Sequence, residues 1–425
     1  MKTLILGSGG REHALALSLS QVTPADELYC APGNPGISAV ATLVPDLDPN
    51  DPDAVARWAV DHVVGFVVIG PEAPLVAGVA DAVRAAGIPC FGPSAQAARL
   101  EGSKAFAKDV MAAAGVPTAA CRVCGDVEAV EAACAEFGAP YVVKDDGLAA
   151  GKGVVVTNDL GEALAHARSC LEGRQGASVV VEEYLDGPEI SLFCLCDGTN
   201  VVPLSPAQDF KRAYNGQTGP NTGGMGAYSP LPWAPEDLER EVTETIALPT
   251  IREMARRGIP FVGLLYCGLA LTSKGLRVVE FNARFGDPET QVVLPLEGEH
   301  LPRMLYAAAT GTLGEVAPHG RARGAAVTVV IANEGYPGAL VEPGRPISGI
   351  EEAESIGGVH VIHAGTSFDG DTLRASGGRV LDIVAVGDTL TQARQRAYDA
   401  AERIGLVGAH MRTDIAADAA EGRGA

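Results

Sequence analysis

The sequence lacks long apolar runs and has few aromatic residues. Aromatic residues make up 5% of the 425 residues, and no stretch reaches the roughly 20 consecutive apolar residues of a membrane helix. The apolar stretch near the start, Leu4 to Leu6, is too short for the core of a signal peptide. We therefore expect a cytoplasmic protein without a membrane partner.

Basic residues are also scarce, because 32 Lys and Arg against 53 Asp and Glu give a formal net charge of −21. Such a surface repels polyanions, so we expect no nucleic-acid partner. Only seven of the basic residues are lysines. If the substrates are phosphates, positive groups must be gathered locally, which makes these lysines candidates for binding them.

The nine cysteines do not form a recognisable framework. Their number is odd and they are scattered, which predicts free thiols in a reducing compartment. Cys121 and Cys124 form one C-x-x-C pair, but the chain has no second pair at zinc-site spacing. We interpret the pair as coincidental.

The predicted elements divide the chain into three regions, as its length suggests. From Thr3 to about Gly92, strands alternate with helices, the pattern of a doubly wound parallel sheet. An α+β region follows a linker at 93–102, and it contains a long segment, 208–228, without regular signals. A smaller α+β region begins at about 323. The expected fold class is a multidomain α/β and α+β protein with a Rossmann-like N-terminal domain.

A glycine-rich turn at 7–10 follows the first strand and leads into a helix. Backbone amides at such a helix start can bind phosphate. A dinucleotide site does not fit, because Glu12 stands where G-x-G-x-x-G needs a small residue, and no acid closes the second strand. A later strand end carries Glu72, which could accept hydrogen bonds from sugar hydroxyls.

Polar residues alternate along the predicted strand that begins at Val278. Glu280, Asn282 and Arg284 share one face. The other face would point into the core with three apolar residues: Val279, Phe281 and Ala283. Carboxylate and amide oxygens suit Mg²⁺, and an arginine on the same face suits a carboxylate or phosphate.

Two further segments suggest a nucleotide site. Strands at 141–144 and 154–157 flank a glycine-rich loop that carries Lys152, like a flap over phosphates. The loop is not a P-loop, since its spacing is one residue short and Gly153 replaces the Ser or Thr. An apolar strand at 178–184 runs into carboxylates, as an adenine slot with a ribose-binding acid would require.

Together these segments resemble the phosphoribosylamine–glycine ligases, or glycinamide ribonucleotide synthetases, of the ATP-grasp superfamily. The resemblance covers nearly the whole chain, and Arg284 to Thr290 is its most specific part. The other matching segments are Gly7–Leu15, Ala31–Asn34, Gly70–Leu75, Leu100–Lys104, Asp146–Val154, Gly219–Pro230 and Glu280–Gln291.

The resemblance implies a domain division and a reaction. The domains would be a Rossmann-like phosphoribosylamine-binding domain at 1–101, an ATP-grasp domain at 102–322 with a flap at about 120–188, and a small C-terminal α+β domain at 323–425. The enzyme would ligate glycine to 5-phosphoribosylamine with ATP in de novo purine biosynthesis. The products would be glycinamide ribonucleotide, ADP and phosphate, formed through glycyl phosphate by a monomer or weak homodimer.

The resemblance also implies roles for individual residues. Glu280 and Asn282 would bind Mg²⁺ or Mn²⁺. The implied ATP-binding residues are Lys104, Lys144, Gly147, Gly151, Lys152, Gly153, Glu182, Glu183, Tyr184, Leu185 and Glu189. The implied catalytic residues are Arg284, Asp209, Lys211 and Asp287, and the phosphoribosyl group would be bound by Gly10, Asn34, Gly36 and Glu72.

Two alternatives stay open at this point. Another ATP-grasp carboxylate–amine ligase would share the flap and the metal ligands, but it would not need the loops at Gly7 and Pro71, which suit a phosphoribosyl group. A non-catalytic nucleotide-binding protein on the same fold would have lost a metal ligand or the flap lysine. Because Glu280, Asn282 and Lys152 are all present, the sequence favours an enzyme.

Overall fold

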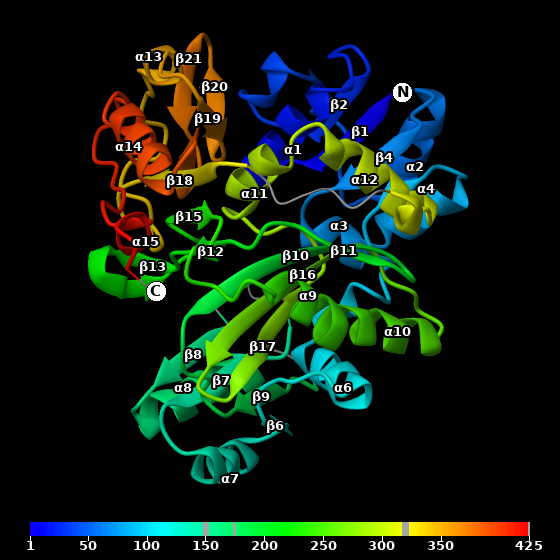
Figure 1. Cartoon of the computed structure of the whole chain (residues 1–425), viewed down its shortest axis with the longest axis vertical. Helices are drawn as coiled ribbons and strands as arrows, with labels where there is room; N and C mark the ends of the chain where they lie inside the picture. Colours follow the sequence, from blue (N-terminus) through cyan, green and yellow to red (C-terminus); the bar gives the residue numbers. More distant parts are fainter. Residues whose placement is uncertain (148–152, 173–175, 317–322, 424–425) are drawn as a thin grey trace.

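The computed structural model describes residues 1–147, 153–172, 176–316 and 323–423. In Figure 1 the N-terminal region (blue) and the C-terminal region (orange to red) lie side by side above a central sheet. A small four-stranded lobe lies at the opposite end. The polar residues singled out above lie mainly where these parts meet.

The N-terminal region is a parallel five-stranded sheet of order β3-β2-β1-β4-β5. Its central strand is buried along its whole length because its side chains are covered on both faces. The strands are β1 Thr3–Gly7, β2 Leu28–Pro32, β3 Thr42–Leu43, β4 Phe66–Ile69 and β5 Cys90–Phe91, and the helices are α1 Gly10–Ser20, α2 Pro52–Asp61, α3 Glu72–Ala77 and α4 Val79–Ala85. The predicted doubly wound topology is confirmed.

A glycine divides the helical segment that follows β4. Gly78 has a left-handed φ of +89°, which ends α3 and starts α4. Glu72 therefore lies in the first turn of α3 rather than in an irregular turn.

The central sheet is antiparallel, with order β11-β10-β16-β17. Its strands are β10 Glu189–Asp197, β11 Val201–Pro203, β16 Val262–Thr272 and β17 Gly275–Asn282. The surrounding helices are α5 Arg99–Gly102, α6 Lys104–Ala114, α9 Leu238–Val242, α10 Leu248–Arg256, α11 Thr290–Glu297 and α12 His300–Thr310. A π-helical turn at Thr243–Ala247 joins α9 and α10.

The alternation along β17 is broken by a bulge. The pairing with β16 passes from Glu280 to Val278 between two consecutive partners, which leaves Val279 as the extra residue. Val278, not Val279, is fully buried in the core, so the predicted orientation of Val279 is wrong. Phe281 and Ala283 point into the core as expected.

The small lobe is the predicted flap. Its sheet has the order β6-β9-β7-β8, and α7 and α8 pack against it. The elements are β6 Cys121–Cys124, α7 Val127–Phe137, β7 Tyr141–Asp145, β8 Val154–Thr157, α8 Leu160–Glu172 and β9 Val179–Glu182. The buried apolar residues here form a cluster that shares no residue with the other core clusters.

The C-terminal sheet includes strands from the middle of the chain. Its order is β12-β15-β18-β22-β19, and β12 Gln208–Asp209 and β15 Gly226–Ser229 belong to the segment expected to be irregular. That expectation is wrong, because pairing with β18 Ala325–Ala332 orders this segment. The other elements are β13 Arg212–Tyr214, β14 Thr218–Asn221, α13 Ile350–Glu354, β19 Val359–His363, β20 Thr366–Asp369, β21 Thr372–Ala375, β22 Arg379–Gly387, α14 Leu390–Ala401 and α15 Ala417–Ala420.

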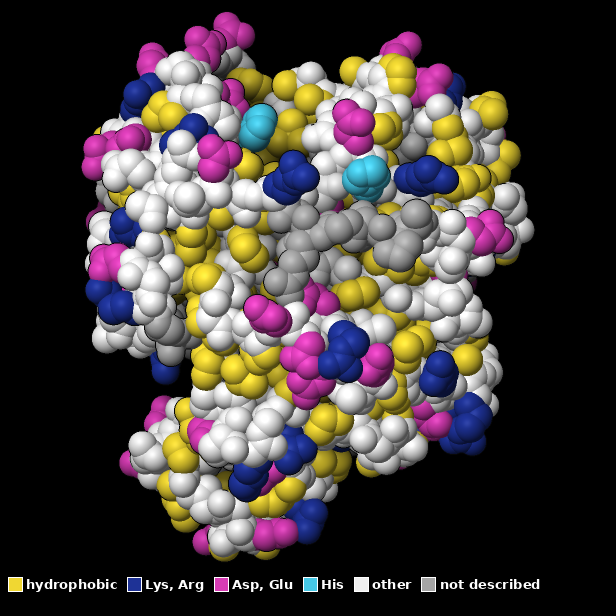
Figure 2. Space-filling model, in the orientation of Figure 1, with side chains coloured by type: hydrophobic (Ala, Val, Ile, Leu, Met, Phe, Trp, Pro, Cys, Tyr) yellow, Lys and Arg dark blue, Asp and Glu magenta, His cyan; other side chains and the backbone are white. Residues whose placement is uncertain are grey.

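The surface fits the acidic composition. Figure 2 shows Asp and Glu side chains spread over this face, and a notch separates the lower lobe from the upper body on one side. In the described ranges, no helix combines the length and the apolar character needed to cross a membrane.

Candidate functional site

A cavity of about 1500 Å³ opens between the flap, the central sheet and the two terminal regions. Its lining includes Arg11 and Glu72 from the N-terminal region, and Arg379 and Arg412 from the C-terminal region. The fold therefore brings together polar residues that are hundreds of positions apart in the sequence.

The predicted metal ligands lie on the wall formed by β17. Glu280 and Asn282 both line the cavity, as the alternation of the strand predicts. Burial acts to raise the pKa of Glu280, but Lys211, Lys144 and Lys104 together outweigh it and lower that pKa. Glu280 is therefore ionised at neutral pH and offers a charged oxygen ligand beside the Asn282 amide.

At the end of the cavity that is predicted to bind the nucleotide, called the nucleotide end, one carboxylate is shared by two lysines. Glu182 Oε2 lies 3.2 Å from Lys108 Nζ and 3.1 Å from Lys144 Nζ. Lys108 also donates to Thr118 Oγ1 and to the Ala119 carbonyl, so all three of its N–H groups are used.

Lys144 remains available to a ligand. Besides its ion pair with Glu182, it donates only to the Val279 carbonyl, at 3.0 Å, among the residues that the structure describes. One N–H of its ammonium is therefore left for a phosphate oxygen. The bulge described above exposes that carbonyl, so an irregularity in β17 helps to fix a cavity lysine.

The flap residues form the other wall of this end. Lys104 Nζ donates to the Gly147 carbonyl at 3.1 Å, and Gly147 and Gly153 line the cavity. Gly151 and Lys152, predicted to bind ATP, lie outside the described residues. Four further predicted ATP-binding residues line the cavity: Glu183, Tyr184, Leu185 and Glu189.

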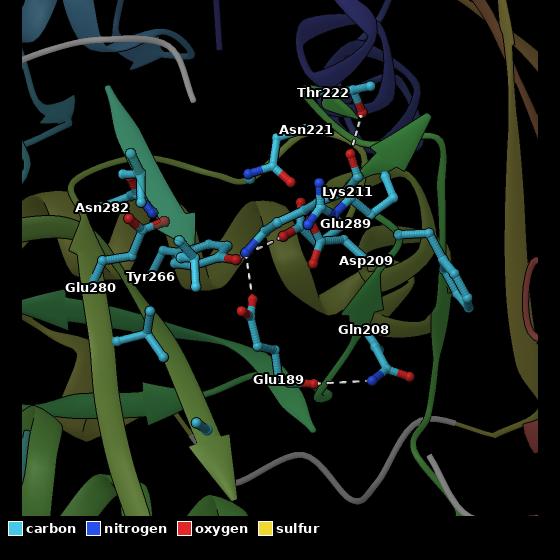
Figure 3. Close-up of a pocket in the computed structure, with 18 of the residues that line it drawn as sticks. Glu189, Gln208, Asp209, Lys211, Asn221, Thr222, Tyr266, Glu280, Asn282 and Glu289 are labelled. Carbon is cyan, nitrogen blue, oxygen red and sulfur yellow. Dashed lines mark hydrogen bonds and ion pairs between the residues drawn. The ribbon is translucent and has the colours of Figure 1, made fainter. Parts of the chain in front are cut away.

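A second cluster surrounds Lys211, whose ammonium lies 2.5 Å from Glu189 Oε2 (Figure 3). Buried Glu289 accepts hydrogen bonds from Tyr266 at 2.8 Å and from Ser191 at 3.0 Å. Asp209 lies beside this cluster in the same view.

The surroundings of Asp209 raise the pKa of its carboxyl group. Burial, reinforced by Glu289, Glu189 and Glu280, raises the pKa of Asp209 to about 7, although Lys211 opposes the rise. Asp209 therefore exchanges a proton near neutral pH, which suits a group that transfers protons.

At the end that is predicted to bind the other substrates, called the substrate end, one guanidinium is shared by two carboxylates. Arg284 Nη2 lies 2.9 Å from Glu101 Oε1, and Arg284 Nε lies 3.6 Å from Glu72 Oε2. The second oxygen of Glu101 accepts the Ala283 amide at 2.8 Å. Arg284 Nε is buried and has no hydrogen-bond partner in the described residues.

The pKa values of the two carboxylates, Glu101 and Glu72, are shifted in opposite directions. Burial raises the pKa of Glu101, although Arg284 offsets part of the rise. Burial also acts on Glu72, but there Arg284 and Arg11 outweigh it and lower the pKa. Glu101, whose side chain is 8% exposed, is the more enclosed partner of Arg284, and Glu72, at 34%, is the more open one.

Asp287 lies where all three regions meet. Arg379 Nη1 donates to the Asp287 carbonyl at 2.9 Å and lies 3.2 Å from its Oδ1, and Gln291 Nε2 donates to that oxygen at 2.9 Å. Burial opposes ionisation, but Arg379 and Arg11 lower the pKa of Asp287.

Three of the four predicted phosphoribosyl-binding residues do not line this cavity. Asn34 donates its amide to the Ser8 and His363 carbonyls, both at 2.9 Å. A Cβ on Gly10 would lie 2.2 Å from Asp382 Oδ2, and one on Gly36 would lie 2.4 Å from His13. These residues have a visible packing role, and their binding role stays a prediction.

Three family models match the chain. They describe the N domain (residues 1–101), the ATP-grasp domain (102–290) and the C domain (326–418) of phosphoribosylglycinamide synthetase. The chain belongs to this family. The expected ATP-grasp fold is thereby confirmed.

Individual relatives agree with this assignment. The chain is 60% identical over 422 residues to a phosphoribosylamine–glycine ligase of Streptomyces coelicolor, covering 99% of this chain and 100% of the relative. A crystal structure of the Thermotoga maritima phosphoribosylamine–glycine ligase matches with a TM-score of 0.85 and 32% identity, over 98% and 100% of the two chains. A Campylobacter jejuni biotin carboxylase shares the fold alone, with a TM-score of 0.70 and 15% identity over 96% and 93%.

Sequence reasoning missed several cavity residues of this family member: Arg11, Glu101, Lys108, Glu289 and Arg379. Arg11 and Glu101 lie inside segments that carry the resemblance, so their charge was a usable signal. Lys108 is one of only seven lysines, which was a second signal. Arg379 gave none, because its place beside Asp287 depends on how the C-terminal sheet packs.

Proposed function

We propose that this protein joins glycine to 5-phosphoribosylamine at the expense of ATP, giving glycinamide ribonucleotide, ADP and phosphate. Its membership of the phosphoribosylglycinamide synthetase family makes it an ATP-dependent carbon–nitrogen ligase of purine biosynthesis. The observation that carries the proposal is a single cavity in which nucleotide-side lysines and the Arg284 cluster face one another.

The reaction has two bond-forming steps. A carboxylate oxygen of glycine attacks the γ-phosphorus of ATP, the bond to the β-phosphate oxygen breaks, and ADP leaves. The nitrogen of phosphoribosylamine then attacks the acyl carbon of glycyl phosphate and loses a proton, and the bond to phosphate breaks. Both steps need charge neutralisation and positioning more than covalent help.

The cavity residues supply this positioning. Lys104 and Lys144 bind phosphate oxygens, and Glu182 with the segment at 183–185 lines the adenine. Arg284 lines the cavity, and its guanidinium orients the glycine carboxylate. Its second carboxylate neighbour, Glu72, is 3.6 Å away and can turn to the ribose hydroxyls.

The proton that the amine loses needs an acceptor. Asp209 is suited to this task because its pKa is raised to about 7 and it lines the cavity. Lys211, which pairs with Glu189, balances the negative charge around it. Asp287 completes the substrate side from the wall shared with the C-terminal region.

The residues present fit a divalent metal ion. Glu280 and Asn282 offer two hard oxygen ligands, and the remaining ligands would be phosphate oxygens and water, as is usual for Mg²⁺. In the described ranges, no group of three or more His, Cys, Asp or Glu residues could hold a metal without such help. Bound Mg²⁺ or Mn²⁺ would neutralise charge between the phosphates.

The test is phosphate release from ATP and Mg²⁺, with glycine and freshly made phosphoribosylamine added separately and together. We expect release, and formation of glycinamide ribonucleotide, only when both are present. The second candidate is another ATP-grasp carboxylate–amine ligase. Release with a different acid or amine, and none with this pair, would favour that candidate and overturn the proposal.

A further inference from the structure

Arg379, an arginine of the C-terminal region, lines the cavity. Arg379 is the first residue of β22, and its side chain is 21% exposed and lines the cavity. Its Nη1 donates to the Gly223 carbonyl at 2.8 Å and to the Asp287 carbonyl at 2.9 Å. One nitrogen of this side chain therefore joins two cavity segments that are 64 positions apart.

The C-terminal region makes a second contact with the segment that contains Gly223. The Gly223 amide donates to the Tyr336 hydroxyl at 2.9 Å. Gly223 is thus bound at its carbonyl by Arg379 and at its amide by Tyr336. Next to it, a Cβ on Gly224 would lie 2.3 Å from the ring of Pro288, so the two cavity segments are in close contact.

The second segment is also held twice from β22. Arg379 binds Asp287 directly, at its carbonyl and at Oδ1. Gln291 Nε2 lies between Asp287 Oδ1 and Asp382 Oδ2, donating to them at 2.9 and 2.8 Å. Asp382 is fully buried on the same strand, so β22 reaches Asp287 by one direct and one relayed contact.

These contacts define one wall of the substrate side. Asp287 follows Arg284 by three residues, and the neighbouring segment at 221–223 also lines the cavity. Partly buried charged contacts of this kind restrict side chains to one geometry. Small displacements of a positioned group reduce the rates of bond-forming steps strongly.

We propose that Arg379 is a positioning residue of the ligase reaction, through which the C-terminal domain fixes Asp287 and the 221–224 segment around the substrates. This inference rests on the proposed function, and it adds a role for a domain that carries none of the predicted site residues. Arg379 acts on the substrate side, so the nucleotide end, held by Lys144 and Glu182, does not depend on it.

The experiment compares Arg379→Gln with Arg374→Gln in the full-length protein. Arg374 is a matched control, because it belongs to the same domain and also binds a backbone carbonyl, that of Gly344, but does not line the cavity. We expect Arg379→Gln to reduce kcat/KM for phosphoribosylamine about 100-fold. The KM for ATP should stay within about twofold of the parent value, and Arg374→Gln should match the parent.

Three further measurements separate positioning from a general loss of structure. Arg379→Lys keeps the charge, but its nitrogen is one bond closer to the backbone than Arg379 Nη1 and cannot reach both carbonyls, so it should recover at most about a tenth of the lost activity. Guanidinium ion, added in millimolar amounts to Arg379→Gly, should restore turnover. Gly223→Ala places a Cβ 3.1 Å from Arg379 Cζ, and it should lower kcat/KM about tenfold without a change of charge.

The outcomes distinguish this inference from the proposed function. If the parent enzyme does not turn over glycine with phosphoribosylamine, the proposed function fails. If the parent is active and Arg379→Gln equals Arg374→Gln, the positioning role is overturned. An equal rise in the KM values of ATP and phosphoribosylamine would also overturn the positioning role. If Arg379→Gln does not fold, the kinetics of Arg379→Lys and Gly223→Ala test the positioning role instead.

Discussion

The two ends of the cavity carry opposite arrangements of charge. At the nucleotide end, the Glu182 carboxylate is shared by Lys108 and Lys144. At the substrate end, the Arg284 guanidinium is shared by Glu101 and Glu72. The nucleotide end has one more cation than anion, and the excess positive charge can bind a triphosphate. At the substrate end, an anionic substrate must compete with Glu101 and Glu72 for the Arg284 guanidinium.

This difference shows that local charge ratios decide binding in a chain whose formal net charge is −21. The general acidic field opposes every anionic ligand. The nucleotide end overcomes it with spare lysine donors. The substrate end has one guanidinium, that of Arg284, and part of it is already used, because Nη1 donates to the Phe285 carbonyl and Nη2 pairs with Glu101.

Breaking the substrate-end arrangement at its centre should have the largest effect. Arg284→Gln removes the cation that we propose to orient the glycine carboxylate, and we expect kcat to fall about 10³-fold, as for loss of one donor to developing charge. Single-turnover formation of glycinamide ribonucleotide measures this, and ATP affinity, measured separately, should not change. A matching loss of ATP affinity would show that the two ends are not independent.

Removing the enclosed partner of Arg284 should have a smaller effect on the same end. Glu101→Gln keeps an acceptor for the Ala283 amide but removes the charge that holds the guanidinium. We expect kcat/KM for glycine to fall about 10²-fold while the KM for ATP stays unchanged. Parent-like kinetics in this variant would mean that Glu72 alone positions Arg284.

At the nucleotide end, Lys108→Met tests whether Lys108 acts through Glu182. Glu182 keeps Lys144 but loses one of its two lysines, so Lys144 is drawn more fully to the carboxylate and less to phosphate. We expect the KM for ATP to rise about tenfold, with kcat at saturating ATP nearly unchanged. The control is Lys274→Met, an exposed lysine outside the cavity, and an equal effect there would contradict the assignment.

The smallest effect concerns stability against pH, where Glu101 and Glu72 should differ in sign. The pKa of Glu101 is raised on folding, so protonation as pH falls through it favours the folded state. The pKa of Glu72 is lowered, so its contribution, present above the unfolded value near 4.5, is lost as pH falls further.

Unfolding free energies of the parent, Glu101→Gln and Glu72→Gln, measured from pH 7.5 down to about pH 3, test this difference. As pH falls, the parent should gain stability relative to Glu101→Gln and lose it relative to Glu72→Gln. Slopes of equal sign would mean that the two carboxylates share one environment, and the contrast drawn between them would not hold.

Much of the fold and part of the site could be predicted from the sequence. Strand alternation placed Glu280 and Asn282 on the cavity wall, because period two is a local property of the backbone. It failed at Val279, since a bulge depends on the partner strand. It also failed for the segment at 208–228, which is ordered by pairing with a strand about 100 residues later.

The remaining cavity residues depend on contacts between regions. Arg379 reaches Asp287 only because β22 pairs with β18, and β18 with β15. Gly10 and Asn34 stand in segments typical of phosphate binding, yet their visible contacts are with the C-terminal region and its neighbours. Local sequence signals the kind of group a segment can bind, but it does not tell which face of that segment another domain covers.

The flap has a core of its own, with no residue in common with the clusters beneath the rest of the molecule. Its apolar contacts are therefore separate from those that pack the N-terminal, central and C-terminal sheets. We propose that substitutions in the core of the flap alter the entry of ATP and the release of ADP more than they alter the residues around Arg284. In evolutionary terms, the core of the flap can then vary apart from the core beneath the acceptor side, although both parts contribute residues to one cavity.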